Sequence, residues 1–499
     1  MLPSQGPQGR RADIAIIGHG IVGAVLARCL AESGARVLVV DGGSPLGTPA
    51  GTHLRNLPLG RDDRSAHFDL VRACLRPVSV HRAAGQPLGP DVPPMPEGRG
   101  INAEQVQRGN MPAARSTSVF GGMGTLWSGV APRLVPEIEH WPGIEAQEWN
   151  QLYDRAEELL GVRADQGRGS ARQEFVLDAL AGLTGTVAHS AALAARRIPG
   201  RPAELAWTGP AEVVAEAGAQ ARERIRVLPQ HAVRRLRHRG GRVLTAEALD
   251  LGTGREMSIK ADTFLVAAGG IRTPALLWAS GVGVGEESAL GRYLTDHPLA
   301  YAQVVLSPRA LSGDPAKDAA DPYVVIPVSN QHPYHALLLC DGYDAAALEG
   351  RVDERLVLSL YWYCRMEPRR ENRLLFRAGV SDAFGLPQPT FRYALGPEDR
   401  ARRQAALAEV ETAGGLLGTF LPGRGPQLLS AGASMHVMGT TRTGARDDGA
   451  SVVDGHGRVW GFGNLYLGGT GLLPSPTATN PTLAACALAV RTASRIAAS

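Results

Sequence analysis

Two polar residues near the end of the chain have the types and surroundings needed to act together on a hydroxyl group. His436 lies in Met435-His436-Val437-Met438-Gly439-Thr440, and Asn480 lies in Thr479-Asn480-Pro481-Thr482. An imidazole titrates near neutral pH and can take a proton from an alcohol, while an amide can hydrogen-bond the same oxygen. The two residues are 44 positions apart (480 − 436), but the Gly-, Pro- and Thr-rich turns beside them can bring them to one point.

Each of these residues also has a purely structural interpretation. A single histidine is more often part of the core than a catalytic base. Asn480 could be the N-cap of a helix that begins at Pro481, because proline is preferred at the first helical position. The capping role and the catalytic role of Asn480 are compatible.

The N-terminus independently predicts a dinucleotide site. A buried-strand pattern over 13–17 leads into Gly18-His19-Gly20-Ile21-Val22-Gly23, a helical stretch follows, and a second strand over 35–41 ends at Asp41. In this context Gly18 allows the tight turn, Gly20 lets the backbone approach a pyrophosphate, and Gly23 lets helix and strand close up. The helix N-terminus would offer amide donors to the phosphates.

Two side chains of this unit receive different interpretations. Asp41 would accept hydrogen bonds from the adenosine ribose hydroxyls, which fits either FAD or NAD and argues against a 2′-phosphate. His19 is interpreted as an exposed turn residue without a chemical role. The alternative for the whole unit is a glycine-rich turn that binds nothing.

A second glycine-rich stretch, 118–129, could bring backbone close to a flat ligand, because glycine has no side chain to interfere. Trp127 alone is more often a core residue than a cofactor contact. Ser128 could be a polar group beside the ligand ring or a turn hydroxyl with a local partner.

Length, charge and cysteine content limit the class of protein and the kinds of binding site that the chain can form. The chain has 499 residues, enough for two or three folding units, and its formal charge of +4 gives no case for nucleic-acid binding. No apolar run approaches the roughly 18 residues of a membrane span, and no apolar signal-peptide core precedes the first strand, so we expect a cytoplasmic protein. The five cysteines are odd in number, scattered and without a C-x-x-C pair, which predicts neither a disulfide framework nor a metal site.

The order of the elements predicts an α/β fold with a mostly antiparallel second sheet. Residues 42–115 show little periodicity and predict long loops or a lid. Apolar patterns predict helices at 147–195, 203–223, 273–277 and 397–418, strands at 225–228, 232–236 and 263–270, and further strands at 302–306, 323–328, 335–340, 356–365 and 374–377.

These features, in this order, resemble the glucose–methanol–choline (GMC) flavoprotein oxidoreductases, and within them the pyranose oxidase branch. The segment 121–128 resembles that branch's flavin-attachment loop. Arg365-Met366-Glu367-Pro368-Arg369-Arg370-Glu371-Asn372 and Pro387-Gln388-Pro389-Thr390-Phe391 resemble its substrate-domain signatures. Leu467-Gly468-Gly469 and Asn480-Pro481-Thr482 resemble its C-terminal flavin contacts.

The resemblance implies two discontinuous domains. A two-dinucleotide-binding (Rossmann-like) FAD domain would comprise 1–75, 110–165, 205–299 and 430–499. An α+β substrate domain with its lid would comprise 76–109, 166–204 and 300–429. It also implies His436 and Asn480 as the catalytic pair, with the helix from Pro481 directing its positive end at the flavin. The implied FAD contacts are Gly18, Gly20, Gly23, Asp41, Gly121, Gly122, Met123, Thr125, Ser128, Val233, Ala268, Gly269, Gly469, Asn480, Pro481 and Thr482.

At several positions this chain differs from the pyranose oxidase branch that it resembles, and each difference leads to a prediction. Fungal pyranose oxidases attach FAD through a histidine of the loop, where this chain has Leu126, so the resemblance implies non-covalent FAD. Leu337 and Tyr361 stand at the positions of a glutamine and an arginine of the sugar pocket, while Asp341 keeps its acid. The chain is also shorter than the fungal enzymes and lacks their insertions for tetramer assembly, so we expect a monomer or a small homo-oligomer.

The favoured hypothesis is FAD-dependent oxidation of a secondary hydroxyl of a sugar or glycoside, with oxygen or another molecule as the electron acceptor. A glycoside fits the altered pocket better than a free hexose. The alternatives are an enzyme that oxidises an aminosugar or another natural product, and a plain pyranose oxidase. An NAD-dependent dehydrogenase and a non-catalytic flavin-binding protein are the remaining hypotheses, and the pairing of His436 with Asn480 argues against both.

Overall fold

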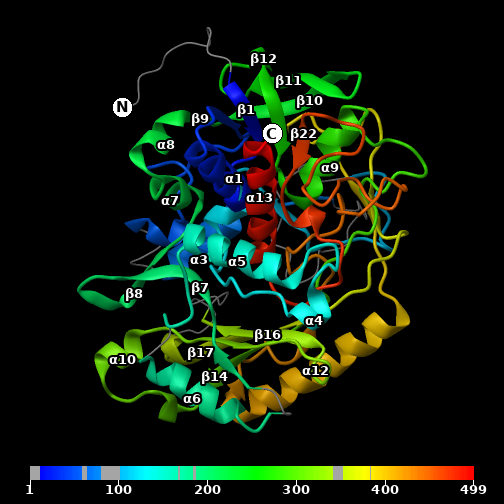
Figure 1. Ribbon diagram of the computed structural model, residues 1–499. Coiled ribbons are helices and arrows are strands. Elements are labelled where there is room, and N and C mark those ends of the chain that lie inside the picture. Colours follow the sequence, from blue (N-terminus) through cyan, green and yellow to red (C-terminus); the bar gives the residue numbers. More distant parts are fainter. Residues whose placement is uncertain are drawn as a thin grey trace.

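The computed structural model describes residues 12–58, 64–79, 102–166, 169–183, 187–340, 352–382 and 384–499. Two main sheets organise these residues, a parallel one and an antiparallel one (Figure 1). Within the described residues, no helix is both long enough and apolar enough to cross a membrane.

The parallel sheet contains the predicted strand–helix–strand unit. β1 (Ala12–Ile17) leads into α1 (Ile21–Glu32) and then into β2 (Val37–Val40), so this prediction is confirmed. The strand order is β22-β13-β1-β2-β9, with β9 at Ile225–Leu228, β13 at Ala261–Val266 and β22 at Leu465–Leu467, and every pair is parallel. The strands are almost entirely apolar, as expected where helices and other elements cover both faces of a parallel sheet.

On one face of the parallel sheet, the first and last helices of the described residues lie side by side. α13 (Thr482–Ala497) packs against α1, as the blue and red helices in the centre of Figure 1 show. Both helices are buried along most of their length, with small residues such as Ala24, Ala27, Ala485 and Ala489 in the core. Their N-terminal ends therefore lie in the same region of the fold.

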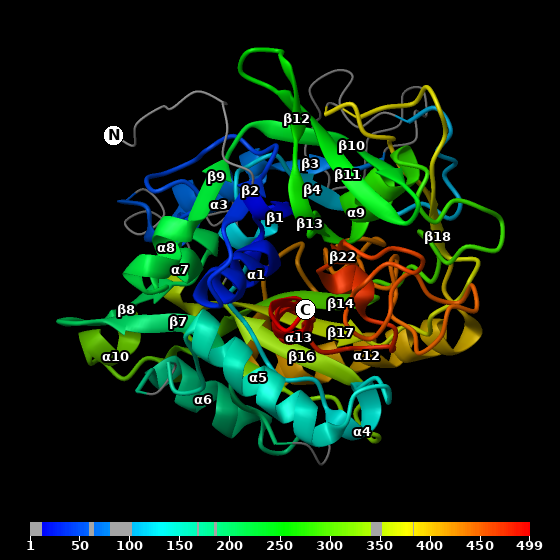
Figure 2. The ribbon, with the colours of Figure 1, turned by 45° about the horizontal axis from the view of Figure 1, so that its top comes forward.

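The antiparallel sheet is confirmed over 299–364. Its strand order is β20-β14-β17-β16-β15-β6, and its central strands are β14 (Leu299–Leu306), β15 (Tyr323–Ile326), β16 (Tyr334–Leu339) and β17 (Val357–Cys364). β6 is His189–Ser190, β20 is Gly418–Phe420, and β21 (Gln427–Leu428) pairs with β14. The predicted long helix is α12 (Pro397–Leu417), which covers one face together with α6 (Ala171–Leu180) (Figure 2). The other face points toward the cavity described below.

The remaining elements connect these layers. They are η1 (Leu54–Asn56), α3 (Arg64–Cys74), β3 (Leu75–Pro77), β4 (Arg115–Thr117), η2 (Gly122–Thr125), α4 (Pro136–Glu139), α5 (Ala146–Leu160), β5 (Val162–Arg163), β7 (Leu193–Ile198), β8 (Arg201–Trp207), α7 (Pro210–Ala215), α8 (Ala219–Arg224), β10 (His231–Arg239), β11 (Arg242–Asp250), β12 (Glu256–Ile259), α9 (Gly269–Ala279), η3 (Pro308–Ala310), α10 (Pro315–Ala319), η4 (Glu354–Leu356), β18 (Arg373–Leu375), β19 (Thr390–Arg392) and η5 (Thr470–Leu472). The predicted domain boundaries stay predictions.

The sequence-based expectation was wrong in two segments. The helix predicted over 147–195 and 203–223 is interrupted by β7 and β8, which form an antiparallel hairpin with a turn at Gly200, whose φ is +78°. Alanine and arginine favour helices locally, but pairing of β7 with β5 and β8 overrides that preference. Residues 42–115 also contain α3, which was not predicted.

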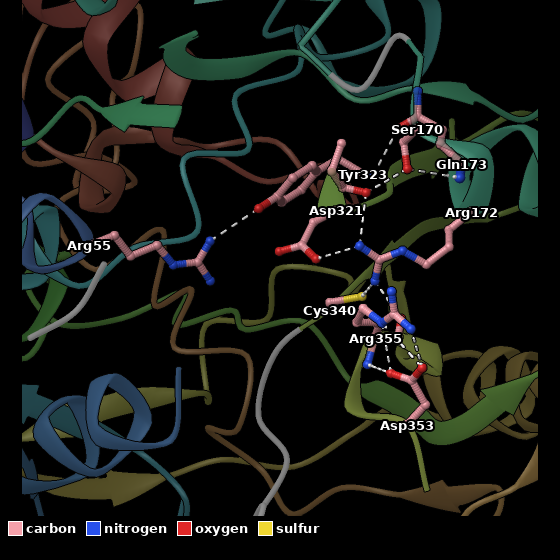
Figure 3. A network of polar contacts seen from close by, with 10 residues as sticks. Arg55, Ser170, Arg172, Gln173, Asp321, Tyr323, Cys340, Asp353 and Arg355 are labelled. Carbon is pink, nitrogen blue, oxygen red and sulfur yellow. Dashed lines mark hydrogen bonds and ion pairs between the residues drawn. The ribbon is translucent and has the colours of Figure 1, made fainter. Parts of the chain in front are cut away.

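A buried arginine connects α6 to the antiparallel sheet (Figure 3). The guanidinium of Arg172 donates to the carbonyl oxygen of Ala320 at 2.9 Å and to the carboxylate of Asp321 at 3.1 Å. It also donates to the carbonyl oxygen of Arg355 and lies 3.7 Å from Sγ of Cys340. The network thus ties the end of β16 to η4. Asp341, the predicted substrate acid, lies outside the described residues.

Candidate active site

A cavity of about 670 Å³ lies where the carboxyl ends of β1, β2 and β13 face the antiparallel sheet. This is where open α/β sheets bind ligands. Ile17, Val40 and Ala267 line it from one side, and Tyr361 and Tyr363 line it from the other. Most of the predicted cofactor residues line this cavity, namely Gly18, Gly20, Asp41, Gly122, Met123, Ser128, Val233, Ala268, Gly269, Gly469, Asn480, Pro481 and Thr482.

Four glycines leave the cavity wall open at the backbone. A Cβ on Gly20 or Gly122 would have its nearest neighbouring atom 3.9 Å away, and one on Gly269 or Gly469 would meet nothing within 4 Å. Gly122, Gly269 and Gly469 also have φ values of +57°, +81° and +118°, which favour glycine. The missing side chains therefore leave space on the cavity side that a bulky ligand can use.

Three predicted residues support the site from outside the cavity lining. A Cβ on Gly23 would lie 2.1 Å from the carbonyl oxygen of Gly18, so only glycine lets α1 pack against this turn. Gly121 has a φ of +93°, and the hydroxyl of Thr125 donates to the carbonyl oxygen of Gly122 at 2.9 Å. These residues shape the loops and do not themselves line the cavity.

Asp41 lies at the end of β2 with its carboxylate fixed by backbone donors. The amide of His19 donates to Oδ2 at 2.8 Å and the amide of Gly43 donates to Oδ1 at 2.7 Å. The interpretation of His19 as an exposed residue was wrong, because its side chain is buried and stacks on Phe120 with ring centroids 4.7 Å apart. Burial lowers the pKa of His19 to about 4, against the opposing attraction of Asp41.

The structure brings His436 and Asn480 together at the cavity wall. Nδ2 of Asn480 lies 3.4 Å from Nε2 of His436, and Nδ1 of His436 lies 3.1 Å from Nδ1 of His297. Burial lowers the pKa of His436 to about 4, so the imidazole is neutral at pH 7. A neutral imidazole has a lone pair and can accept a proton without first losing one.

A buried carboxylate holds the His436 loop. Asp296 accepts hydrogen bonds from the amide of Gly432 at 2.9 Å, from the amide of His436 at 3.2 Å and from the hydroxyl of Ser434. Burial raises the pKa of Asp296, and these hydrogen bonds act in the opposite direction. Met435, next to His436, has a φ of +58°, a conformation that non-glycine residues rarely adopt and that surrounding contacts must enforce.

A second buried carboxylate holds the Asn480 loop. Oε1 of Glu139 accepts from the amides of Ala478 at 2.7 Å and Thr479 at 2.9 Å, while Oε2 accepts from the amide of Val135 at 2.8 Å. The prediction that Asn480 caps the helix was wrong, because Pro481 occupies the N-cap position of α13 and no side chain caps that end. Oδ1 of Asn480 is buried and has no hydrogen-bond partner among the described residues.

Asp296, His297 and Glu139 were missed by sequence reasoning. A signal existed for the first two, since an acid and a histidine precede Pro298 and then a mostly apolar strand. Buried charged residues at such a position need partners. Glu139 sits in a short helix after a proline and carries no comparable signal.

The predicted substrate residues have three different outcomes. Tyr361 lines the cavity and stacks near Tyr363, with ring centroids 6.0 Å apart, and the Tyr363 ring lies 5.5 Å from the His436 ring. Leu337 lies opposite Tyr361 in the strand register but is 1% exposed and does not line the cavity. Asp341 lies outside the described residues. All three substrate roles stay predictions.

Comparison with known proteins places this site in a family. Residues 213–299 and 368–489 match the two parts of the family described as GMC oxidoreductase. The chain is 30% identical to pyranose 2-oxidase from Emericella nidulans, over 97% of this chain and 92% of that protein. The chain belongs to the GMC oxidoreductase family. It is also 30% identical to a C-glycoside 3-oxidase from Microbacterium trichothecenolyticum, over 98% and 96% of the two chains.

The fold is also found in a solved structure of low sequence identity. A solved structure of Aspergillus oryzae formate oxidase is similar to this chain with a TM-score of 0.69 at 14% identity, and 99% of each chain is covered. The predicted family and fold class are thus confirmed.

Membership of this family implies FAD as the cofactor, and the cavity fits it. The N-termini of α1 and α13 both line the cavity, at Gly20 and at Pro481, and helix N-termini favour negative charge. The open backbone at Gly20, Gly122, Gly269 and Gly469 and the carboxylate of Asp41 would complete the binding site.

Alanine substitutions can distinguish a glycine that the fold requires, Gly23, from a glycine that we expect to contact FAD, Gly20. We expect Gly23→Ala to lower the unfolding temperature of the FAD-free protein, because its Cβ would lie 2.1 Å from Gly18 O. Gly20→Ala should leave that temperature nearly unchanged and weaken FAD binding, because its Cβ would occupy the cavity side. Thermal unfolding of the FAD-free protein and titration with FAD measure both effects. Equal destabilisation by the two variants would contradict this assignment.

Proposed function

We propose that this GMC oxidoreductase oxidises a secondary hydroxyl of a sugar or glycoside to a ketone, with FAD as cofactor and oxygen as the final acceptor. The observation that carries the proposal is the neutral imidazole of His436, 3.4 Å from the amide of Asn480 at the wall of the cavity. Two relatives matched over nearly their full lengths support the substrate class, since one is named for pyranose and the other for a C-glycoside.

The residues of the pair have complementary roles in this proposal. When bound, FAD supplies a hydride acceptor. Nε2 of His436 takes the hydroxyl proton as the adjacent C–H bond breaks, and Nδ2 of Asn480 donates a hydrogen bond to the same oxygen and holds it in place. The positive end of α13 stabilises negative charge that develops beside it.

Replacement of the base tests the proposal directly. We expect His436→Ala to bind FAD normally and to slow reduction of the flavin by substrate about 10²–10⁴-fold, the usual contribution of a positioned base. Asn480→Ala should be slowed less, because Asn480 positions the oxygen and takes no proton. Anaerobic stopped-flow absorbance measures these rates, and a His436→Ala rate near that of wild type would remove His436 from the mechanism.

The pH dependence of flavin reduction tests the state of the same imidazole. Protonation removes the base, and burial lowers the pKa of His436 to about 4. The rate in the wild-type protein should therefore be level between about pH 6 and 8 and fall only on further acidification. A midpoint near the ordinary histidine pKa of about 6.5 would contradict a desolvated base.

We propose that FAD is held without a covalent bond. Leu126 stands where the similar fungal enzymes carry the attachment histidine, it lines the cavity, and its side chain has no nucleophile. Acid precipitation should release the yellow colour into the supernatant, and colour retained in the pellet of the wild-type protein would refute the proposal. Leu126→His is the matched variant, because it restores the nucleophile at the same position.

We propose that the substrate is a glycoside and not a free hexose, because of an aromatic side chain at the cavity wall. Tyr361 presents an aromatic ring at the wall, in contact with Tyr301 at 4.9 Å between ring centroids. Aromatic faces pack well against sugar rings and flat aglycones. Leu337 pairs with Tyr361 in the strand register but does not line the cavity, so the preference rests on Tyr361.

Glucose should therefore have a lower kcat/KM than glycosides with a large substituent. A steady-state comparison of glucose with matched O- and C-glycosides and with an aminoglycoside measures this difference. Tyr361→Phe keeps the aromatic face and should retain most of the glycoside activity, whereas Tyr361→Ala should lose it. A kcat/KM for glucose above that of every glycoside would favour a plain pyranose oxidase.

A further inference from the structure

His297 is the closest polar neighbour of the proposed base on the side away from Asn480. It precedes β14, its side chain is 1% exposed, and its ring meets the His436 ring edge to face with centroids 5.0 Å apart. Nδ1 of His297 lies 3.1 Å from Nδ1 of His436, and Nε2 of His297 lies 3.4 Å from the hydroxyl oxygen of Thr477. Both ring nitrogens of His297 thus have a hydrogen-bonding neighbour, Thr477 at Nε2 and His436 at Nδ1.

The direction of these hydrogen bonds follows from Thr477. Its hydroxyl donates to Sδ of Met438 at 3.3 Å, and a thioether sulfur can only accept. The single hydroxyl proton is therefore used, and the oxygen offers a lone pair to His297. Nε2 of His297 must then carry the proton and donate to Thr477.

The position of the proton on His297 also determines the tautomer of His436. Burial, followed by the charges of His436 and His335, lowers the pKa of His297 well below its usual value, so its imidazole is neutral and has one N–H. With that proton on Nε2, Nδ1 of His297 can only accept, and Nδ1 of His436 must be the donor. The free lone pair of His436 is left on Nε2, the nitrogen that faces the amide of Asn480.

We propose that His297 is a positioning residue that holds His436 in the Nδ1–H tautomer, with Nε2 free to accept the substrate proton. This inference rests on the proposed role of His436 as the base. Without the acceptor at His297, His436 can place its proton on Nε2, and that tautomer cannot take a proton at the nitrogen beside Asn480. A histidine base needs a partner on its second nitrogen for this reason.

The chain of contacts also links the two catalytic loops. Met438 lies on the His436 loop and Thr477 on the Asn480 loop, and His297 lies between them. A shift of either loop would weaken the hydrogen bonds that set the tautomer.

Nuclear magnetic resonance of the FAD-bound protein labelled with ¹⁵N-histidine tests the proposal without turnover. Long-range ¹H–¹⁵N spectra distinguish the two neutral tautomers, and the His436 signals are those lost in His436→Gln. We expect the Nδ1–H pattern in the wild-type protein and its loss in His297→Leu. His297→Asn should keep the pattern, because an amide oxygen can stand close to the position of Nδ1.

Two further variants make the test independent of folding defects. Thr477→Val keeps the shape but removes the hydroxyl, so it should also shift His436 toward the Nε2–H pattern. His335→Leu is the matched control, because His335 is equally buried and has no hydrogen-bond partner on either ring nitrogen among the described residues. An Nε2–H pattern in the wild-type protein, or an unchanged pattern in both His297→Leu and Thr477→Val, would overturn the proposal.

Kinetics separate this proposal from the proposed function. Flavin reduction should slow about 10- to 100-fold in His297→Leu, as when the outer partner of a functional histidine is lost, and recover in His297→Asn. If the tautomer changes as expected but no sugar or glycoside reduces the flavin in the wild-type protein, the proposed function fails and the positioning role stands. If the wild type is active but His297→Leu reduces the flavin at the wild-type rate, the positioning role fails alone.

Discussion

The site depends on two buried carboxylates, each of which fixes the backbone of one loop. Asp296 binds the backbone that carries His436, and Glu139 binds the backbone that carries Asn480. Charge-assisted hydrogen bonds from backbone amides are strong, and removing one partner leaves the other group buried and unsatisfied. This pairing allows two residues on irregular loops to meet at 3.4 Å and allows Met435 to keep its left-handed backbone. The helices and sheets support the two loops, and the hydrogen bonds to these carboxylates fix the loop backbone beside His436 and Asn480.

Charged, partly charged and neutral groups all contribute to the electrostatics of the cavity wall. The N-termini of α1 and α13 contribute partial positive charge, while Asp41 at the end of β2 contributes a fixed carboxylate. The neighbouring imidazoles of His297, His335 and His436 all have lowered pKa values because they are buried. These three imidazoles are therefore neutral at pH 7, and in the proposed mechanism the proton taken up by His436 would be the first positive charge among them.

The parts of the fold that sequence reasoning predicted are those with local signals. The glycine spacing from Gly18 to Gly23 predicted β1, α1 and β2, and apolar runs predicted the antiparallel sheet and α12. Proximity of His436 and Asn480 was also predictable, because both lie in turn-rich segments that resemble one family. The hairpin of β7 and β8 was missed because tertiary pairing overrode local helix propensity. Asp296 and Glu139 were missed because their partners are 136 and 339 positions away in the sequence, and no local pattern records such contacts.

Strand β17 connects Tyr361 at the cavity wall to His436 through side-chain packing. Tyr361 and Tyr363 lie two residues apart on this strand, so their side chains share one face, and the Tyr363 ring contacts both Tyr361 and His436. The Tyr363 ring also meets the His297 ring edge to face, with centroids 5.7 Å apart. Tyr361, the residue proposed to contact the substrate, is therefore packed through Tyr363 against His436 and His297. A substitution that moves Tyr363 would also disturb its packing against His297 and His436. Under the roles proposed for these residues, we expect substrate range and proton transfer to change together.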